Sequence, residues 1–144
     1  MQESYEKDFY FWTQQQAEVL KKGLINELDF EHLAEEIESM GKSEKRELIS
    51  RMAILLAHLL KWQFQLGNRS NSWKYTIKEQ RISVHELLED SPSLKSEIKQ
   101  RFNYAYNKAR LKAAKETGLE EESFPEISPF TLEQTLDRDF WPAT

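Results

Sequence analysis

The first residues whose types and spacing could do chemistry are His32, Glu35 and Glu36. On a helix, offsets of three and four residues place side chains on one face, so this imidazole and the two carboxylates would be neighbours. Nitrogen and oxygen ligands of this kind suit zinc, manganese or iron. With His58 as a further ligand, the set predicts a metal site, which would serve a metal-dependent enzyme.

The same histidines have a purely structural interpretation. Helical bundles that hold two iron ions use Glu-x-x-His on each of two helices, and neither His58 nor His85 has a Glu three positions before it. His58 lies among leucines, so its ring N–H must be satisfied within the core, and Glu35 or Glu38 could accept it. We favour this interpretation and expect no cofactor. A divalent metal is the alternative.

A second group of chemically capable residues lies at positions 67–81, where basic and aromatic side chains alternate. A helix start with free N–H groups and nearby cations can hold phosphate, and aromatic rings between cations suit a single-stranded nucleic acid. The side chains expected to bind such a polyanion are Arg69, Trp73, Lys74 and Arg81. The cations at positions 95–115 could extend the patch. Alternatively, the charges form solvated or internally paired faces, and Trp73 belongs to the core.

The formal net charge of −5 conceals an uneven distribution along the 144 residues. Residues 1–50 carry 12 acidic and 6 basic side chains, residues 51–115 carry 5 and 13, and residues 116–144 carry 8 and 1. A basic centre between two acidic ends has two interpretations. The charges either pair within the fold or leave a basic patch for a polyanion.

Hydrophobic periodicity predicts the helices that must position these side chains. Only four glycines and four prolines interrupt the chain. The predicted fold is all-α, a single-domain bundle of about five helices with a proline-containing C-terminal segment docked on it. The helices are expected at about 4–22, 29–40, 44–66, 73–89 and 94–117, with a short turn at 131–136. Leu33, Ile37 and Met40 give the second helix a narrow apolar stripe, and Gly41 is expected to end or bend it.

Several classes of protein are disfavoured by what the sequence lacks. There is no cysteine, which excludes thiolate chemistry and fits a reducing cytoplasm. We see no basic-then-apolar leader and no apolar stretch long enough for a bilayer, and so expect a cytoplasmic protein without membrane contact. The chain carries no phosphate-binding glycine loop and no nucleophile motif, so an enzyme is disfavoured.

The aromatic content favours a function in binding. Eight Phe, five Tyr and four Trp exceed what one small core is expected to bury. The excess would leave an exposed apolar patch for a protein partner or a second copy of the chain. The sequence therefore predicts a small non-catalytic interaction module. A metal-dependent or nucleic-acid-processing enzyme, and a nucleic-acid-binding protein using residues 67–115, are the alternatives.

A series of strings resembles one known family in order and over essentially the whole chain. The strings are YEKDFYFW, DFEHLAEEIESMG, LLAHLLKWQFQ, RSNSWKYTIKEQR, LLEDSPSL, ETGL at 116–119 and PFTLEQTLDRDFWP. Each string alone is common in helices, but all seven in this order resemble the bacterial family known as domain of unknown function 29. The resemblance implies a compact all-α protein of the bacterial cytoplasm. It implies no activity, cofactor or functional residue.

Overall fold

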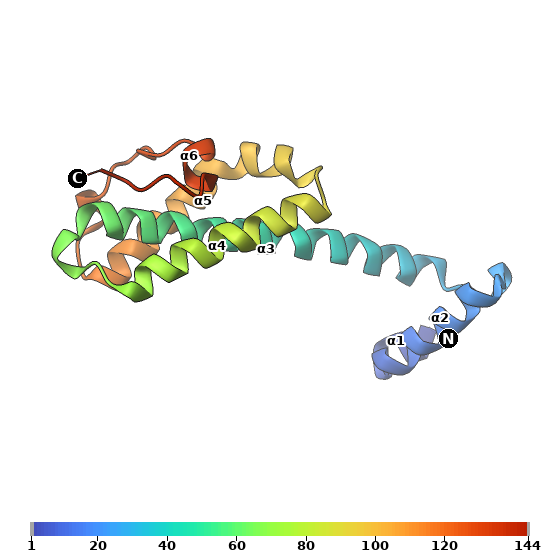
Figure 1. Ribbon diagram of the computed structural model, residues 1–144. Coiled ribbons are helices and arrows are strands. Elements are labelled where there is room, and N and C mark those ends of the chain that lie inside the picture. Colours follow the sequence, from blue (N-terminus) through green and yellow to red (C-terminus); the bar gives the residue numbers. More distant parts are fainter. Residues whose placement is uncertain (1, 144) are drawn as a thin grey trace. The chain divides into compact units, whose positions relative to one another are not determined.

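The computed structural model describes residues 2–143, and every regular element among them is helical (Figure 1). The predicted all-α class is confirmed. Contacts between residues fall into two units, Met1–Glu44 and Lys45–Thr144, here called unit 1 and unit 2. Helix α3 (Phe30–Phe64) begins in unit 1 and continues into unit 2. No helix of the described chain is long and apolar enough to cross a membrane.

Unit 1 consists of α1 (Gln2–Lys7), α2 (Phe9–Lys22), a 3-10 turn η1 (Ile25–Glu27) and the start of α3. A single helix over residues 4–22 was expected, and that prediction is wrong. Asp8 leaves the helical conformation and caps α2, because its carboxylate accepts a hydrogen bond from the N–H of Phe11 at 3.2 Å. Gly23 ends α2 in the left-handed conformation.

Helix α3 is unbroken for 35 residues, so the expected end or bend at Gly41 is also wrong. Residues 29–40 and 44–66 were expected to be separate helices. A single glycine in a helix interior costs only about 1 kcal/mol relative to alanine. The residues next to Gly41 are good helix formers, and the rest of α3 contains no proline. The penalty of one glycine is therefore too small to stop the helix.

Unit 2 contains the rest of α3, α4 (Asn71–Asp90), α5 (Leu94–Thr117), the short α6 (Leu132–Leu136) and two 3-10 turns, η2 (Leu66–Asn68) and η3 (Glu121–Ser123). The predicted 73–89, 94–117 and 131–136 elements correspond closely to α4, α5 and α6. Ser70 caps α4 through its side chain, and Thr131 and Gln134 form a capping box at α6.

The core of unit 2 lies between α3, α4 and α5. Its fully buried large apolar side chains are Leu48, Met52, Leu55, Leu56, Leu59, Leu60, Ile77 and Ile98. The alanines Ala105, Ala109 and Ala113 on α5 are also completely buried, which allows α3 and α5 to approach closely. This packing explains why residues 48–60 are apolar around almost the whole helix.

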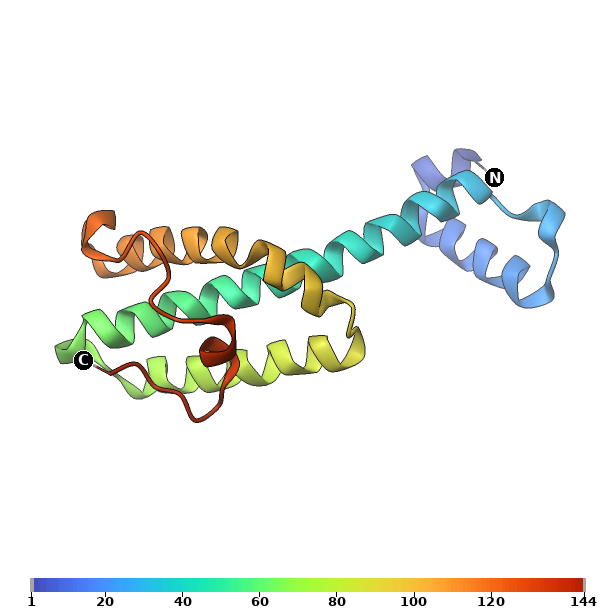
Figure 2. The same ribbon diagram turned by 90° about the horizontal axis from the view of Figure 1, so that it is seen from above.

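The C-terminal segment packs against the core, as predicted, and crosses the helices in Figure 2. Phe124 and Phe130 are buried, and two polar side chains of α4 bind the last turn of α6. Arg81 Nε donates to the carbonyl of Thr135 at 2.9 Å, and His85 Nε2 lies 2.8 Å from the carbonyl of Leu136. These donors satisfy carbonyls that have no partner within so short a helix.

Candidate functional site: an acidic apolar stripe on helix α3

Unit 1 exposes a large share of the apolar surface of the protein. Nine of the sixteen exposed large apolar side chains among the described residues lie in its 44 positions. They are Phe9, Tyr10, Phe11, Leu20, Leu24, Ile25, Phe30, Ile37 and Met40. Apolar residues scattered singly over a surface are ordinary, but a concentration in one small unit is unusual and makes it a candidate site.

The most regular part of this surface lies on the first turns of α3. Phe30, Ile37 and Met40 are 62%, 68% and 65% exposed, at spacings that place them along one side of the helix. The exposed carboxylates Glu31, Glu35 and Glu38 lie on another face of the same helix, because none of them is three or four residues from an apolar residue of this row. We call Phe30, Ile37 and Met40 the α3 stripe. Helical periodicity had indicated Ile37 and Met40 as an apolar face, but the fold leaves both of them open to solvent.

A buried polar network fixes the start of the helix that carries the stripe. The carboxylate of Asp29 accepts hydrogen bonds from the indole Nε1 of Trp12 at 3.0 Å and from the N–H of His32 at 3.4 Å, and it contacts His32 Nδ1 at 2.7 Å. The side-chain oxygen of Gln16 accepts the N–H of Asp29 at 2.9 Å. Asp29 thus caps the N-terminus of α3, and it also ties α3 to α2.

Aromatic packing joins α1 to the same point. The ring of Tyr5 stacks on the imidazole of His32, with centroids 3.9 Å apart, and meets Trp12 edge-on at 4.8 Å. The Tyr5 hydroxyl donates to the carboxylate of Glu36. Glu36 is therefore occupied within unit 1, whereas Glu31, Glu35 and Glu38 are exposed to solvent.

The network also determines the charges of its members. The hydrogen bond to Asp29 raises the pKa of His32, although partial burial opposes this change. Burial alone would raise the pKa of Asp29, but hydrogen bonds from His32 and Trp12 outweigh it and lower that pKa. The hydrogen bond to Glu36 and burial raise the pKa of Tyr5 to about 12. A protonated His32 paired with an ionised Asp29 is thereby favoured.

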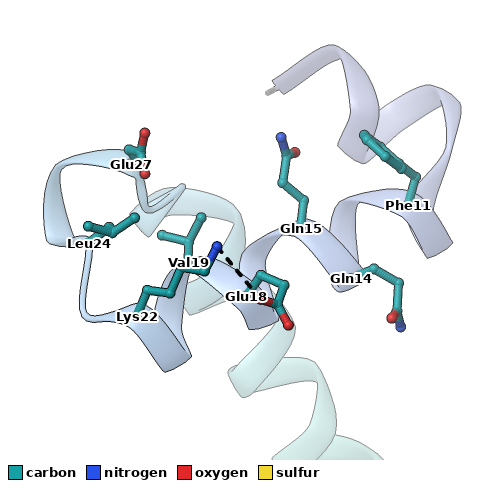
Figure 3. Close-up of a pocket in the computed structure, with 8 residues that line it drawn as sticks. All are labelled: Phe11, Gln14, Gln15, Glu18, Val19, Lys22, Leu24 and Glu27. Carbon is teal, nitrogen blue, oxygen red and sulfur yellow. Dashed lines mark ion pairs between the residues drawn. The ribbon is translucent and has the colours of Figure 1, made fainter.

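A shallow open hollow of about 390 Å³ lies between α2 and η1 in the same unit. Figure 3 shows Phe11, Val19 and Leu24 around it, with an ion pair between Glu18 and Lys22 at one side. It has few polar groups that converge on one point, so it lacks the character of a site for a small polar ligand. It does extend the apolar surface of unit 1.

The four residues expected to bind a metal do not form a ligand set. His32 belongs to unit 1 and His58 to unit 2, and within residues 2–143 no three His, Asp or Glu side chains are grouped as metal ligands. Glu36 binds Tyr5, and Glu35 is exposed to solvent.

The ring N–H of His58 finds its acceptor within α3 itself. His58 Nδ1 lies 2.9 Å from the carbonyl of Ile54, and a carbonyl only accepts, so this nitrogen carries the proton. The suggestion that Glu35 or Glu38 accepts this proton is therefore wrong. Burial lowers the pKa of His58, in contrast to His32.

Three of the four residues expected to bind a polyanion are engaged with neighbouring groups. Arg69 stacks on Trp62 at 4.6 Å and donates to its carbonyl at 2.8 Å. Trp73 is half-buried beneath the ammonium of Lys61, 5.1 Å from the ring centre. Lys74 lies over the ring of Tyr75. These contacts anchor the turn between α3 and α4.

Arg81 does not belong to any surface patch, and this part of the polyanion prediction is wrong. Its side chain is 1% exposed and its guanidinium lies 5.7 Å from the ring of Trp141. It donates to α6 rather than to an external anion. Burial lowers its pKa from the ordinary value. The charge of Arg81 therefore has a structural role in holding the C-terminal segment.

One comparison with known proteins gives a match. The family model described as "Domain of unknown function DUF29" matches residues 4–141. No curated protein and no solved structure gives a significant match. The family description names no activity, so the geometry of the two units is the basis for a functional conclusion.

Proposed function

We propose that this chain, which belongs to the DUF29 family, is a non-catalytic interaction module that binds a basic amphipathic helix of a protein partner through the α3 stripe. The observation that carries the proposal is the exposure of Phe30, Ile37 and Met40 at about two-thirds of their surface each, on a helix that is otherwise firmly anchored. We place the protein in the bacterial cytoplasm, in keeping with its cysteine-free sequence.

The regular spacing of the stripe favours a helical partner. Apolar side chains at positions 30, 37 and 40 follow the pattern by which one helix presents anchors to another. Burying a side chain such as Ile or Met contributes roughly 1.5–3 kcal/mol, so a few anchors suffice for a reversible complex. The network around Asp29 holds these anchors in place before binding, which limits the entropy lost on association.

The charge of unit 1 favours a basic partner. Residues 1–44 hold 11 acidic and 4 basic side chains, a net charge of −7. Glu31, Glu35 and Glu38, on another face of the same helix, add to this charge and form no ion pair within the described chain. A partner that carries lysines or arginines would be attracted by the negative charge of unit 1, and one of the opposite charge would be rejected.

Titration calorimetry with a designed peptide tests the proposal. The peptide carries one apolar face bordered by lysines at spacings of four and three residues, and a scrambled peptide of the same composition serves as the reference. Binding to the full chain is expected to be specific for the ordered peptide. The double variant Ile37→Ser with Met40→Ser should weaken binding about tenfold or more, because two anchors are lost.

The matched control is Ile82→Ser, since Ile82 is also about half-exposed but lies on α4. It should leave the affinity for the peptide unchanged. Equal binding of the ordered and scrambled peptides would contradict the proposal. So would an affinity that the Ile37 and Met40 substitutions do not reduce while circular dichroism shows an intact fold.

A further inference from the structure

Helix α5 has three faces, and other parts of unit 2 cover two of them. Three alanines of the first face are completely buried in the core. The C-terminal segment covers the second face, where the Tyr106 hydroxyl donates to the carbonyl of Pro125 and Arg110 Nε donates to the carbonyl of Phe124 at 3.2 Å. The third face is open to solvent, and its residues are Lys108, Leu111, Lys112 and Lys115.

This open face forms one wall of a groove of about 410 Å³, and the other wall belongs to α3. The residues of the α3 wall are Ser50, Ala53 and Ile54. Each wall follows the i, i+3, i+4 spacing by which one helix presents a row of side chains to a neighbouring helix. Ser50 and Ala53 are small, so a third helix could approach this wall closely. The geometry therefore fits a helix that packs between α3 and α5.

The groove contains apolar side chains that no part of the described chain covers completely. Leu111 is 55% exposed, and Ile54 across the groove is half-buried. Removal of such surface from water would favour binding of an occupant that brings apolar side chains of its own. An occupant that offers charge alone would leave this surface in contact with water.

The lysines of the groove have few partners within unit 2. Lys108 lies over a tyrosine ring of its own helix, 5.6 Å from the ring centre. Lys112 and Lys115 form no ion pair with any residue that the structure describes. The next carboxylate along α5, Glu116, pairs instead with Lys61 at 3.3 Å. The ammonium groups of Lys112 and Lys115 therefore remain available at the rim of the groove.

We infer that the groove between α3 and α5 binds an acidic amphipathic helix of a protein partner. The apolar face of that helix would cover Leu111 and Ile54, and its carboxylates would lie beside Lys112 and Lys115. From position 98 to position 115, α5 has no acidic residue, so these carboxylates would meet no like charge along it. The inference goes beyond the proposed function, because it concerns a second surface, in the other unit, and a partner of the opposite charge.

An amphipathic helix accounts for more of the groove than a polynucleotide does. A nucleic acid would bind the lysines through its phosphates but would leave Leu111 and Ile54 without an apolar contact. An acidic amphipathic helix uses the lysines and the apolar side chains together. The contact involves one helix and one groove, so the complex should be reversible and should weaken in salt.

Fluorescence anisotropy of a labelled peptide, titrated with the full chain, tests the inference. The peptide is a designed helix with leucines on one face and glutamates beside them, and a scrambled peptide of the same composition is the reference. The ordered peptide should bind more tightly than the scrambled one, and added salt should weaken its binding. Leu111→Ser should reduce the affinity about tenfold, and Lys112→Gln with Lys115→Gln about three- to tenfold.

Each groove variant has a matched control. Ile82→Ser replaces an apolar residue of similar exposure on α4, and Lys78→Gln with Lys95→Gln removes the same charge at exposed positions outside the groove. Both controls should bind the acidic peptide like the wild type. All substituted positions are exposed, so circular dichroism should show an unchanged helix content. The basic peptide that tests the α3 stripe should bind the groove variants as before, so the two proposals can fail separately.

Several outcomes would overturn the inference. One is equal binding of the ordered and scrambled peptides, and another is a control variant that loses as much affinity as its groove variant. Binding of a single-stranded DNA probe that the lysine variant loses and Leu111→Ser retains, without peptide binding, would identify a nucleic-acid site instead. Self-association of the wild type that Leu111→Ser abolishes, again without peptide binding, would identify a second copy of the chain as the occupant.

Discussion

Unit 1 and unit 2 are stabilised in different ways. Among the described residues, the buried side chains of unit 1 are Trp12, Gln16, Val19 and Asp29, and two of these four are polar. Unit 2 buries a large continuous cluster of leucine, isoleucine, alanine and aromatic side chains. Hydrogen bonds with specific geometry therefore dominate in one unit, and removal of apolar surface from water dominates in the other.

This difference explains where the exposed apolar residues concentrate. Unit 2 buries most of its large apolar residues in one core. Unit 1 has too few residues to enclose its aromatic and aliphatic side chains, so many of them face solvent. A unit that is ordered by a polar network can retain exposed apolar anchors without needing to bury them for its own folding.

The largest expected effect tests the apolar core of unit 2. Leu56→Ala removes a completely buried side chain and should lower the free energy of unfolding by about 2–5 kcal/mol. In unit 1, Val19→Ala should reduce it by only about 1–2 kcal/mol, because fewer buried groups are lost. Urea unfolding followed by circular dichroism measures both. Equal losses would break the contrast between the units.

A second prediction addresses the polar network of unit 1. Asp29→Asn keeps the shape of the side chain but removes the negative charge that both His32 and Trp12 contact. It should destabilise unit 1 by about 1–3 kcal/mol, the range for a charge-assisted hydrogen bond in a partly buried site. Hydrogen exchange of the amides of residues 4–44 gives the measurement.

The control for Asp29 is Glu31→Gln, an exposed carboxylate on the same helix. It should change exchange in unit 1 by no more than about 0.5 kcal/mol. If Asp29→Asn accelerates exchange in unit 2 as strongly as in unit 1, then the network is not the local support that the contacts indicate.

The two histidines of α3 should give the two units opposite dependences of stability on pH. The pKa of His32 is raised, so its stabilisation of unit 1 is complete below the ordinary value of 6.5 and is lost as pH rises through the raised pKa. Burial lowers the pKa of His58, so as the pH falls this imidazole is protonated in the unfolded chain before it is protonated in the folded one. Unit 2 therefore loses stability as pH falls from about 6.5 toward that lowered pKa.

NMR titration of the imidazole signals checks the order of the two pKa values, and hydrogen exchange on either side of pH 6.5 checks the opposite trends of the two units. His32→Gln should flatten the pH dependence of unit 1 only, and His58→Gln that of unit 2 only. Parallel trends in both units would show that the histidines do not report on separate environments.

The smallest expected effect concerns the helix that both units share. Gly41→Ala should raise the free energy of unfolding by about 0.5–1 kcal/mol, because Gly41 is helical and no atom lies within 4 Å of the added methyl group. Gly118→Ala is the contrasting variant, since Gly118 has φ +76° and should be destabilised by the same substitution. Thermal unfolding measures both. A loss of stability for Gly41→Ala would mean that α3 needs flexibility there.

Much of the fold followed from local signals. Apolar periodicity indicated the approximate bounds of α4 and α5, and the short turn expected at 131–136 corresponds to α6. Local signals failed where two of them competed. Asp8 could have continued a helix or capped one, and Gly41 could have ended a helix or been tolerated within it.

The candidate site was harder to predict, because its residues look like core residues. Ile37 and Met40 follow the same periodicity as buried side chains, and only the absence of a covering helix makes them a surface. Arg81 shows the reverse case, since its charge predicted exposure but the C-terminal segment covers it. Side-chain type gives the preference for water, whereas the neighbouring elements determine whether that preference is met.

By itself, the sequence determined the helical class, the position of most caps and the uneven charge, because these depend on residues close together in the chain. The tertiary structure alone decided which charged groups remain available. It placed Glu116 beside Lys61, buried Arg81 against α6, and left Glu31, Glu35 and Glu38 of α3 exposed to solvent. Such pairings join residues tens of positions apart, so their geometry exists only once the chain has packed.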